Sequence, residues 1–368
     1  LVSSLVGLSL RVDPLGWSKG AKSSGSLDLE ARLSDAPSVE RMKLTAPGLS
    51  VEGQIDTATE GGLATARFTR VVAGDWLDAA VTLTGTGIGK TPKVAVTGGS
   101  LDLRFMPKAG AGDSGGGPID VELDRLQLSS GIALTSFKGR FDTGGGLQGS
   151  FTSGVNGASE IRGEVSPTDA GSVIRITSDN AGEVIAAAGI FGNGRGGSLD
   201  LTFTPRGPEG HYDGYASFGR IRVQDAPALA ALLGAVSVVG LLEQMAGEGL
   251  VFNQGEVRFI LTPEAVEISQ GSAVGASLGI SAAGLYETKG GRLDLRGVIS
   301  PIYILNGVGQ LVSRRGEGLF GFNYRLTGTA GAPKVAINPL SLLTPGMFRD
   351  IFRTAPPDLE DLLGESGG

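Results

Sequence analysis

The chain has 368 residues, no cysteine, one histidine and a net charge of −7 from 31 basic and 38 acidic residues. The lack of cysteine excludes a disulfide framework and a zinc site with thiolate ligands. The interspersed charges argue against a nucleic-acid-binding protein, which needs a basic stripe to displace counterions. Glycine is frequent, with 62 residues, but the apolar fraction of 40% is too high for a disordered chain.

Apolar and polar residues alternate with a period of two along much of the chain, which is typical of β-strands with one buried face. Glycine-rich stretches separate these runs and predict many short strands. Two such stretches, 108–118 and 205–210, are the expected linkers, the first as a flexible loop between hairpins. The alternation is clearest at residues 120–124, 174–177, 256–261 and 266–268.

The phrase Gly-x-Leu-Asp-Leu occurs four times, with two leucines that point one way and an aspartate that points the other. Its copies begin at Gly25, Gly99, Gly197 and Gly291. Their spacing is too uneven for a solenoid with a fixed rung. The phrase indicates either a long antiparallel meander in which similar strands recur, or simply a common way to begin an amphipathic strand.

Helix signals are few. Asp225 and Pro227 supply a cap residue and a first-turn proline, and four apolar residues follow at helical spacing. Residues 226–242 carry no charge, which is the short limit for a membrane span. Interrupting glycines favour a pair of helices packed on a sheet instead. The apolar residues of this segment are Leu229, Leu232, Leu233 and Val236.

Two further short helices are expected, near residues 303–312 and 345–353. The second presents one apolar face and a basic pair, Arg349 and Arg353, elsewhere on its surface. It either docks on the last strands or rests at a membrane surface. Docking is favoured because a helix of about two turns is marginal alone. The apolar face consists of Met347, Phe348, Ile351 and Phe352.

Apparent catalytic motifs are expected by chance in so glycine-rich a chain. Residues 144–149 and 192–197 match the dinucleotide-binding pattern, but neither lies between a strand and a helix. Residues 16–20 match the nucleophile-elbow pattern without a following helix. His211 lies in a charged, glycine-rich stretch that predicts a solvated hairpin, and no calcium-loop motif occurs. We therefore expect no enzyme, no metal site and no cofactor.

One-sided strands need a cover for their apolar side, and the sequence offers few helices for it. Either the sheet folds onto itself, or part of its apolar face remains as a groove. Such a groove suits acyl chains, because each buried methylene contributes about 0.8 kcal/mol.

From about Ile174 onward the chain resembles the AsmA-like envelope protein family, most closely the C-terminal region of its YhdP branch, among the YhdP/TamB-type bridge-like lipid transport proteins. The first 170 residues share only the strand-rich style. The matching stretches are ITSDNAGEVIAAAGIFGNGRGGSLDL, VQDAPALAALLGAVSVVGLLEQMAGEGLVFNQGEVRF, GLYETKGGRLDLRGVISPIYILNGV and GTAGAPKVAINPLSLLTPGMFRDIF.

The resemblance implies a position in the periplasm of a Gram-negative bacterium. It also implies an inner-membrane anchor, through an N-terminal helix missing from this sequence. A long, taco-shaped β-sheet would enclose an apolar channel for phospholipids between the inner and outer membranes. The family offers no catalytic residue to transfer to this chain.

The prediction is therefore a mostly-β fold: an elongated, curved antiparallel sheet forming a taco-like groove, with a few short α-helices near residues 226–246, 303–312 and 345–353. We expect a β-repeat segment at 1–170, an AsmA-like C-terminal domain at 171–355 and a flexible tail at 356–368. The expected function is phospholipid conduction, with acyl chains and both membrane surfaces as partners. The groove or end-plug candidates are Leu229, Leu232, Leu233, Val236, Met347, Phe348, Ile351 and Phe352.

Two alternatives remain. The first is a closed β core that acts as a non-conducting scaffold for outer-membrane biogenesis. The second is an adhesin-like β-repeat, which the lack of a regular period disfavours. Ordinary core packing is also an interpretation of every groove candidate.

Overall fold

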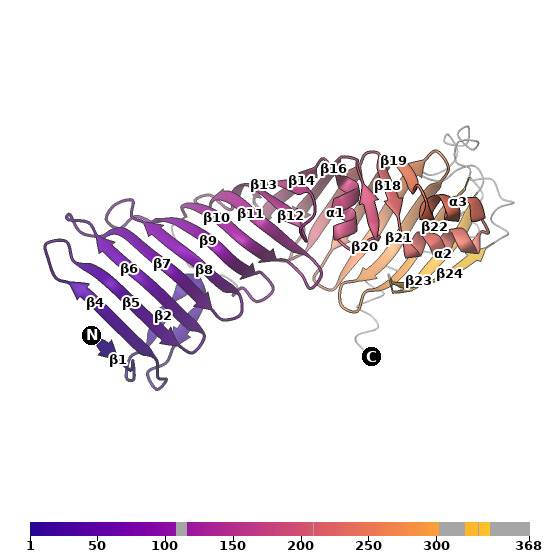
Figure 1. The fold of residues 1–368 in the computed structure, drawn as a ribbon. Helices are drawn as coiled ribbons and strands as arrows, with labels where there is room; N and C mark the ends of the chain where they lie inside the picture. The colour runs from indigo at the N-terminus through magenta and orange to yellow at the C-terminus, as the bar shows by residue number, and fades with distance from the viewer. Residues whose placement is uncertain (108–115, 209, 302–320, 330, 339–368) are drawn as a thin grey trace. The chain divides into compact units, whose positions relative to one another are not determined.

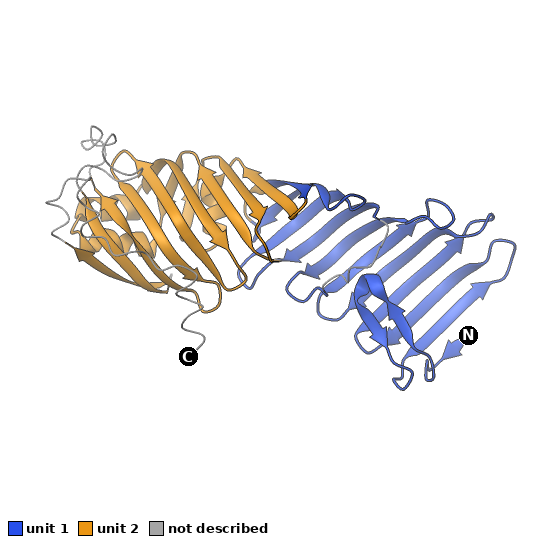
Figure 2. Ribbon diagram, turned by 180° about the vertical axis from the view of Figure 1, so that it is seen from behind, with its two compact units in different colours: residues 1–157, 162–168 blue, residues 158–161, 169–368 orange. Residues whose placement is uncertain are grey.

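The computed structural model describes residues 1–107, 116–208, 210–301, 321–329 and 331–338. The described chain forms two compact units (Figure 2). Unit 1 comprises residues 1–157 and 162–168, and unit 2 comprises residues 158–161 and those from 169 onward. The sequence-based boundary was placed at residue 170. The predicted helices at 303–312 and 345–353 and the predicted tail lie outside the described residues.

The described residues of unit 1 form strands and one short 3₁₀ helix, η1 (Asp13–Leu15) (Figure 1). A small hairpin contains β2 (Leu10–Val12) and β3 (Trp17–Lys19). The other strands are β1 (Val2–Ser3), β4 (Ser26–Arg32), β5 (Ser38–Ala46), β6 (Leu49–Thr57), β7 (Leu63–Ala73), β8 (Leu77–Thr84), β9 (Lys93–Asp102), β10 (Pro118–Gln127), β11 (Ala133–Asp142), β12 (Gln148–Val155) and most of β13 (Glu160–Thr168).

Successive strands of unit 1 pair as antiparallel hairpins from β4 to β9 and again from β10 to β12. Turn residues fit these tight connections: Gly48 takes a φ of 75° after Pro47, and Asn156 and Gly157 both have positive φ. β9 and β10, by contrast, are parallel. The expected linker at 108–118 lies, along the chain, between the β8–β9 and β10–β11 hairpins, and β10 already begins at Pro118.

The β2–β3 hairpin lies on one face of the unit 1 sheet, seen from that side in Figure 2. Trp17 is buried, and its indole Nε1 donates to the carbonyl oxygen of Pro47 at 2.8 Å. Lys19 is only 4% exposed. Its ammonium donates to the carbonyl oxygens of Leu5, Leu8 and Gly20 at 2.8, 3.0 and 3.1 Å, which ties the N-terminal segment to the hairpin.

Unit 2 contains further strands and three short helices among its described residues. The helices are α1 (Ala181–Ala187), α2 (Pro227–Ala235) and α3 (Val239–Ala246). The strands are β14 (Gly171–Ser178), β15 (Asn193–Arg195), β16 (Leu199–Pro205), β17 (Tyr212–Phe218), β18 (Ile221–Gln224), β19 (Leu250–Leu261), β20 (Ala265–Gly275), β21 (Gly279–Glu287), β22 (Arg292–Ser300), β23 (Phe322–Thr329) and β24 (Ala332–Asn338).

The strands of unit 2 are antiparallel, in the order β14, β16, β17, β19, β20, β21, β22, β23 and β24. β18 pairs with the first part of β19 and also with β15. The expected linker at 205–210 is the connection of the β16–β17 hairpin, where Arg206 N donates to His211 O at 2.9 Å. The prediction of a mostly-β, antiparallel fold with a few short helices is confirmed.

α2 and α3 confirm the predicted helix pair at 226–246. Pro227 stands in the first turn as expected, but the N-cap is Ala226 and makes no side-chain cap bond. The expected cap, Asp225, has a φ of 51° and instead accepts a hydrogen bond from Asn193. α2 lies against β24, although α3 leads directly into β19. The unit 2 sheet therefore curves around α2 between β19 and β24.

α1 was not predicted. Asn180 caps it by accepting a hydrogen bond from Glu183 N, and the Glu183 carboxylate accepts one from the Asn180 amide at 2.8 Å. The arrangement differs from a capping box in one bond, because Glu183 binds the side-chain amide of Asn180, whose backbone N donates to Ser178 Oγ at 3.3 Å instead. α1 approaches β15 closely, because a Cβ on Gly182 would lie 2.3 Å from Arg195 N.

Candidate functional site

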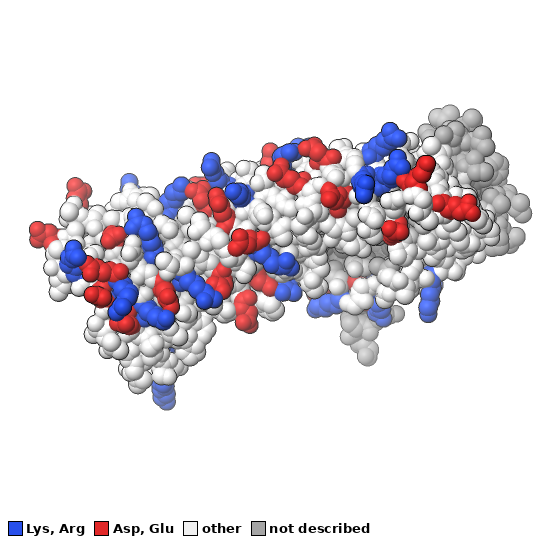
Figure 3. All heavy atoms as spheres, in the orientation of Figure 1, with Lys and Arg blue, Asp and Glu red and all other residues white. Residues whose placement is uncertain are grey.

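One face of the unit 1 sheet carries charges whose sign alternates from strand to strand (Figure 3). From β4 to β11, strands with acidic side chains on this face alternate with strands with basic side chains. The Arg32–Glu40 pair, at the far end of β4 and β5, reverses the order. The ladder consists of Asp28 and Glu30 on β4, Arg41 and Lys43 on β5, Glu52 and Asp56 on β6, Arg67 and Arg70 on β7, Asp78 on β8, Lys93 on β9, Asp120 and Glu122 on β10, and Lys138 and Arg140 on β11.

Neighbouring members of this charge ladder form ion pairs. Lys43 lies 2.6 Å from Glu52, and Arg70 lies 2.8 Å from Asp78. The hydrogen bond from Arg70 lowers the pKa of Asp78, and that from Lys43 lowers the pKa of Glu52. Each such exposed pair contributes little to stability, because water and salt screen the charges. The ladder keeps this face hydrated and electrically balanced.

The aspartate of each Gly-x-Leu-Asp-Leu copy pairs with an arginine, a relationship that the sequence analysis missed. Asp28, Asp200 and Asp294 pair with Arg41, Arg175 and Arg325, each on a neighbouring strand, at 3.4, 2.5 and 2.6 Å. In the second copy Asp102 pairs with nearby Arg104 at 2.6 Å. The signal was present, because an Asp that faces away from two leucines needs a partner on the polar face.

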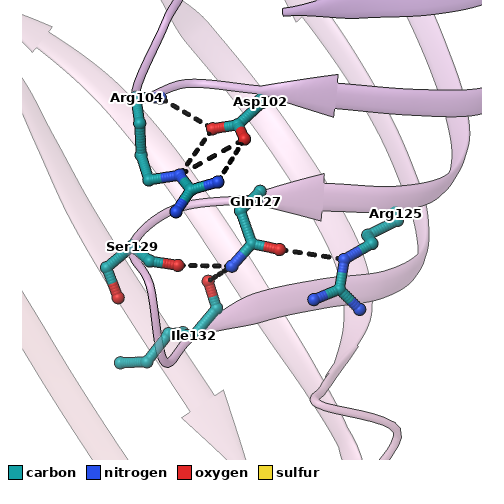
Figure 4. Close-up of polar contacts among 6 residues, drawn as sticks. All are labelled: Asp102, Arg104, Arg125, Gln127, Ser129 and Ile132. Atoms are coloured by element: carbon teal, nitrogen blue, oxygen red, sulfur yellow. Dashed lines mark hydrogen bonds and ion pairs between the residues drawn. The ribbon is translucent and has the colours of Figure 1, made fainter. Parts of the chain in front are cut away.

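A polar cluster lies where β9 and β10 end (Figure 4). Arg104 donates hydrogen bonds from Nε and Nη2 to the Asp102 carboxylate, and these hydrogen bonds lower the pKa of the Asp102 carboxyl. Gln127 is buried; its amide oxygen accepts from Arg125 Nε at 2.9 Å, and its nitrogen donates to Ile132 O at 3.2 Å. Each of these side chains is paired within one of two neighbouring sets, Asp102 with Arg104 and Gln127 with Arg125 and Ile132, so the cluster closes the strand ends instead of presenting reactive groups.

A concave region lies in each unit. The two regions have volumes of about 380 and 480 Å³. The first is lined by Trp76, Asp102 and Arg125 among others, the second by Asp200, Ser217 and Glu256 among others. Within the described ranges, no group of three or more His, Cys, Asp or Glu side chains is placed to hold a metal ion.

The opposite face of unit 1 is apolar. Leu49, Val71 and Leu77, in the rows near the β2–β3 hairpin, are at most 7% exposed. The register continues the same face into rows that remain partly exposed, such as the row of Val81, Val96 and Val121. A further layer over Val81, Val96 and Val121 would bury them to the same degree as Leu49. The partly exposed set, here called the unit 1 apolar rows, comprises Ile55, Phe68, Val81, Leu83, Val94, Val96, Ile119 and Val121.

Unit 2 has a corresponding apolar face. Its partly exposed residues, the unit 2 apolar rows, are Ile174, Ile176, Leu201, Phe203, Val257, Phe259, Val266 and Ile268. Towards β23 this face becomes fully buried: Tyr324 is 5% and Leu326 is 3% exposed. Each unit therefore combines a polar face with an apolar face that is only partly covered.

Phenyl rings on the apolar faces lie over glycines of neighbouring strands. Gly214 stands between Phe203 on one side and Phe259 on the other in the strand register. The two rings meet edge to face with centroids 5.9 Å apart. Phe218 lies opposite Gly255 in the same way. Part of the glycine content is thus explained by packing within strands and not by turns.

The predicted groove candidates fall into three groups. Leu232 and Leu233 of α2 are 2% and 0% exposed, so they are core residues in this structure. Leu229 and Val236 are half-buried. The other candidates, Met347, Phe348, Ile351 and Phe352, lie outside the described residues. The sequence analysis named no residue of the unit 1 or unit 2 apolar rows as a candidate.

The motif matches have structural explanations. Ser18 lies within β3 and not on a turn before a helix, and His211 lies in the β16–β17 connection. At 192–197, a Cβ on Gly194 would lie 2.3 Å from Gly182 O, and one on Gly197 would lie 2.7 Å from the Ile221 side chain. These glycines allow α1 and β18 to approach the backbone closely.

In the part of the chain that the structure describes, no helix is long and apolar enough to span a bilayer. Comparisons with protein-family models, with curated proteins and with solved structures gave no match. The functional argument therefore depends on the two faces themselves.

Proposed function

We propose that this chain is a segment of a periplasmic, inner-membrane-anchored protein that conducts phospholipids along its apolar face between the inner and outer membranes. The observation that carries the proposal is the partial exposure of consecutive apolar rows on one face of each unit. The periplasmic position and the anchor come from the resemblance to the AsmA-like envelope proteins.

The chemistry of the apolar rows favours acyl chains as ligands. Backbone amides in the central strands already pair within the sheet, as between β8, β9 and β10. An extended peptide laid on this face would bury its own amides without partners, at about 1–3 kcal/mol each. An acyl chain has no such groups and gains about 0.8 kcal/mol for each buried methylene.

The charge ladder supports the same function from the other side. A face of paired charges keeps the segment hydrated in an aqueous compartment while the apolar rows bind chains. Phospholipid headgroups would stay in water at the edges of the strands, because burying a charged phosphate in an apolar site is costly.

Neighbouring residues on β16 provide a matched test. Leu201 belongs to the unit 2 apolar rows, and Thr202 points to the polar face opposite Arg175. Organic extraction and mass spectrometry of the purified chain should recover phospholipid from the wild type and from Thr202→Asp, but much less from Leu201→Asp. Circular dichroism establishes that both variants are folded. A wild-type chain that carries no phospholipid, or an L201D variant that carries as much as wild type, would contradict conduction.

The second candidate is a non-conducting scaffold with a closed core. The burial of Leu232 and Leu233, where the unit 2 sheet curves around α2, favours it for that end of unit 2. If extraction yields no lipid while depletion of the protein still impairs the outer membrane, the scaffold function is preferred.

A further inference from the structure

The rings on the apolar faces occupy space that a β-carbon would fill on the neighbouring strand. A Cβ on Gly214 would lie 2.2 Å from both Cε2 and Cζ of Phe259. A Cβ on Gly255 would lie 2.1 Å from Cζ of Phe218. Carbon atoms in ordinary contact are about 3.5–4.0 Å apart. The rings therefore lie close to the sheet surface, at the height of a β-carbon, and do not project away from the sheet.

Backbone conformation does not require glycine at these positions. Neither Gly214 nor Gly255 has a positive φ. Both are paired in the regular antiparallel register of β17 and β19. Their close contacts are with ring atoms and not with backbone atoms. The three atoms nearest to such a Cβ are all ring atoms, so an alanine would collide first with the ring and would force it upward, away from the sheet.

The same arrangement recurs in unit 1. A Cβ on Gly163 of β13 would lie 2.1 Å from Cε1 and Cζ of Phe151 on β12. Phe151 in turn stacks on Phe137, with centroids 5.1 Å apart. The repetition in both units shows that flat rings are a regular feature of the apolar faces.

We infer that Gly214 and Gly255 determine ligand specificity by keeping the partly exposed rings of Phe259 and Phe218 flat, so that unbranched acyl chains can lie across the apolar face. This inference rests on the proposed function. Flat rings give a smooth apolar floor with no side chain standing in the path. A raised ring would form a step that a chain in van der Waals contact has to leave the surface to pass.

The test compares Gly214→Ala with the double variant Gly214→Ala/Phe259→Leu. Both are titrated with palmitoyl-oleoyl phosphatidylglycerol that carries a nitroxide on its headgroup, so that both acyl chains stay unbranched, and binding is followed by electron paramagnetic resonance. G214A should weaken binding about tenfold, and removal of the ring in the double variant should restore it to within about twofold. Gly234→Ala, where a Cβ meets nothing within 4 Å, is the control and should bind as wild type.

The outcomes separate the inference from the proposed function. If the wild type binds and folded G214A binds equally well, the specificity role is wrong while lipid conduction stands. If G214A fails to fold but the double variant folds and binds, the glycine serves stability and the specificity role is again wrong. If the wild type itself binds no phospholipid, the proposed function fails, and the inference fails with it.

Discussion

Arg325 on β23 donates from Nε and Nη2 to the two carboxylate oxygens of Asp294 on β22, at 3.0 and 2.6 Å. These hydrogen bonds raise the pKa of the arginine. Arg175 binds Asp200 in the same two-pronged geometry at 3.1 and 2.5 Å. Bidentate pairs of this kind fix the lateral position of two strands as well as contributing energy.

Replacement of Asp200 should remove part of the acid sensitivity of unit 2. The hydrogen bond from Arg175 lowers the pKa of Asp200 below its ordinary value of 3.8. A carboxylate with a lowered folded-state pKa stabilises the fold above its unfolded pKa, and this stability is lost as the pH falls through the folded value. Asp200→Asn should therefore cost at most about 1 kcal/mol at pH 7, since the pair is largely exposed, and progressively less as the pH falls below 3.8.

Urea unfolding followed by circular dichroism at several pH values measures this difference. Asp213→Asn, at an ion pair without a bidentate hydrogen bond, is the comparison. A cost for D200N that is unchanged between pH 7 and pH 2 would contradict the assigned linkage.

Lys19→Met should loosen the β2–β3 hairpin. The methionine matches the length of the side chain but leaves the carbonyl oxygens of Leu5, Leu8 and Gly20 without their shared donor. We expect unit 1 to lose about 1–3 kcal/mol of stability. Lys22→Met, at an exposed neighbour, should cost nothing measurable.

The two tryptophans make this measurement local. Trp17 lies in the hairpin and Trp76 lies in the β7–β8 connection, both in unit 1. In a Trp76→Phe background, Trp17 fluorescence reports on the hairpin alone. If the unfolding transition of K19M coincides with that of the chain that keeps Lys19, the three carbonyl contacts are dispensable.

Alanine should have opposite effects at two helical glycines. A Cβ on Gly182 of α1 would lie 2.3 Å from Arg195 N, so Gly182→Ala should cost about 1–3 kcal/mol by forcing α1 away from β15. A Cβ on Gly234 of α2 meets nothing within 4 Å, so Gly234→Ala should stabilise unit 2 by about 0.5–1 kcal/mol. Thermal unfolding of the two variants checks both signs, and a shift in the same direction for both would refute the assigned packing.

Truncation in α2 should distinguish core from partly exposed positions. Leu233 is 0% exposed, so Leu233→Ala should cost about 2–5 kcal/mol through a cavity in unit 2. Leu229 is half-buried, and Leu229→Ala should cost clearly less. Denaturant titration of both variants gives the comparison. Equal costs would mean that the apolar side of α2 is not packed as described.

Period-two alternation was enough to predict the strand-rich fold, because one-sided strands leave a direct record in the sequence. The helix pair was predicted from Pro227 and the leucine spacing. The short α1 was missed because its signal is a cap pair, Asn180 and Glu183, that needs no amphipathic stripe. The parallel β9–β10 pairing was missed because it depends on which strand β10 meets, which local pattern does not encode.

The site was predicted less well than the fold. Sequence reasoning placed the groove candidates on helical leucines, since helical spacing is easy to recognise. The partly exposed rows could not be found this way, because Val81 and the fully buried Leu77 follow the same alternation on the same strand. What distinguishes Leu77 from Val81 is its position near the β2–β3 hairpin. The pairing of Gly214 with two rings likewise depends on register between strands.

The alternation of charge makes the hairpin, and not the single strand, the unit by which unit 1 can change length. Loss of β6 and β7 together would bring basic β5 beside acidic β8 and would preserve the alternation of charge between neighbouring strands. Loss of β6 alone would place Lys43 and Arg41 beside Arg67 and Arg70, where like charges repel across neighbouring strands. A protein built on this pattern can therefore evolve a longer or shorter reach in steps of two strands.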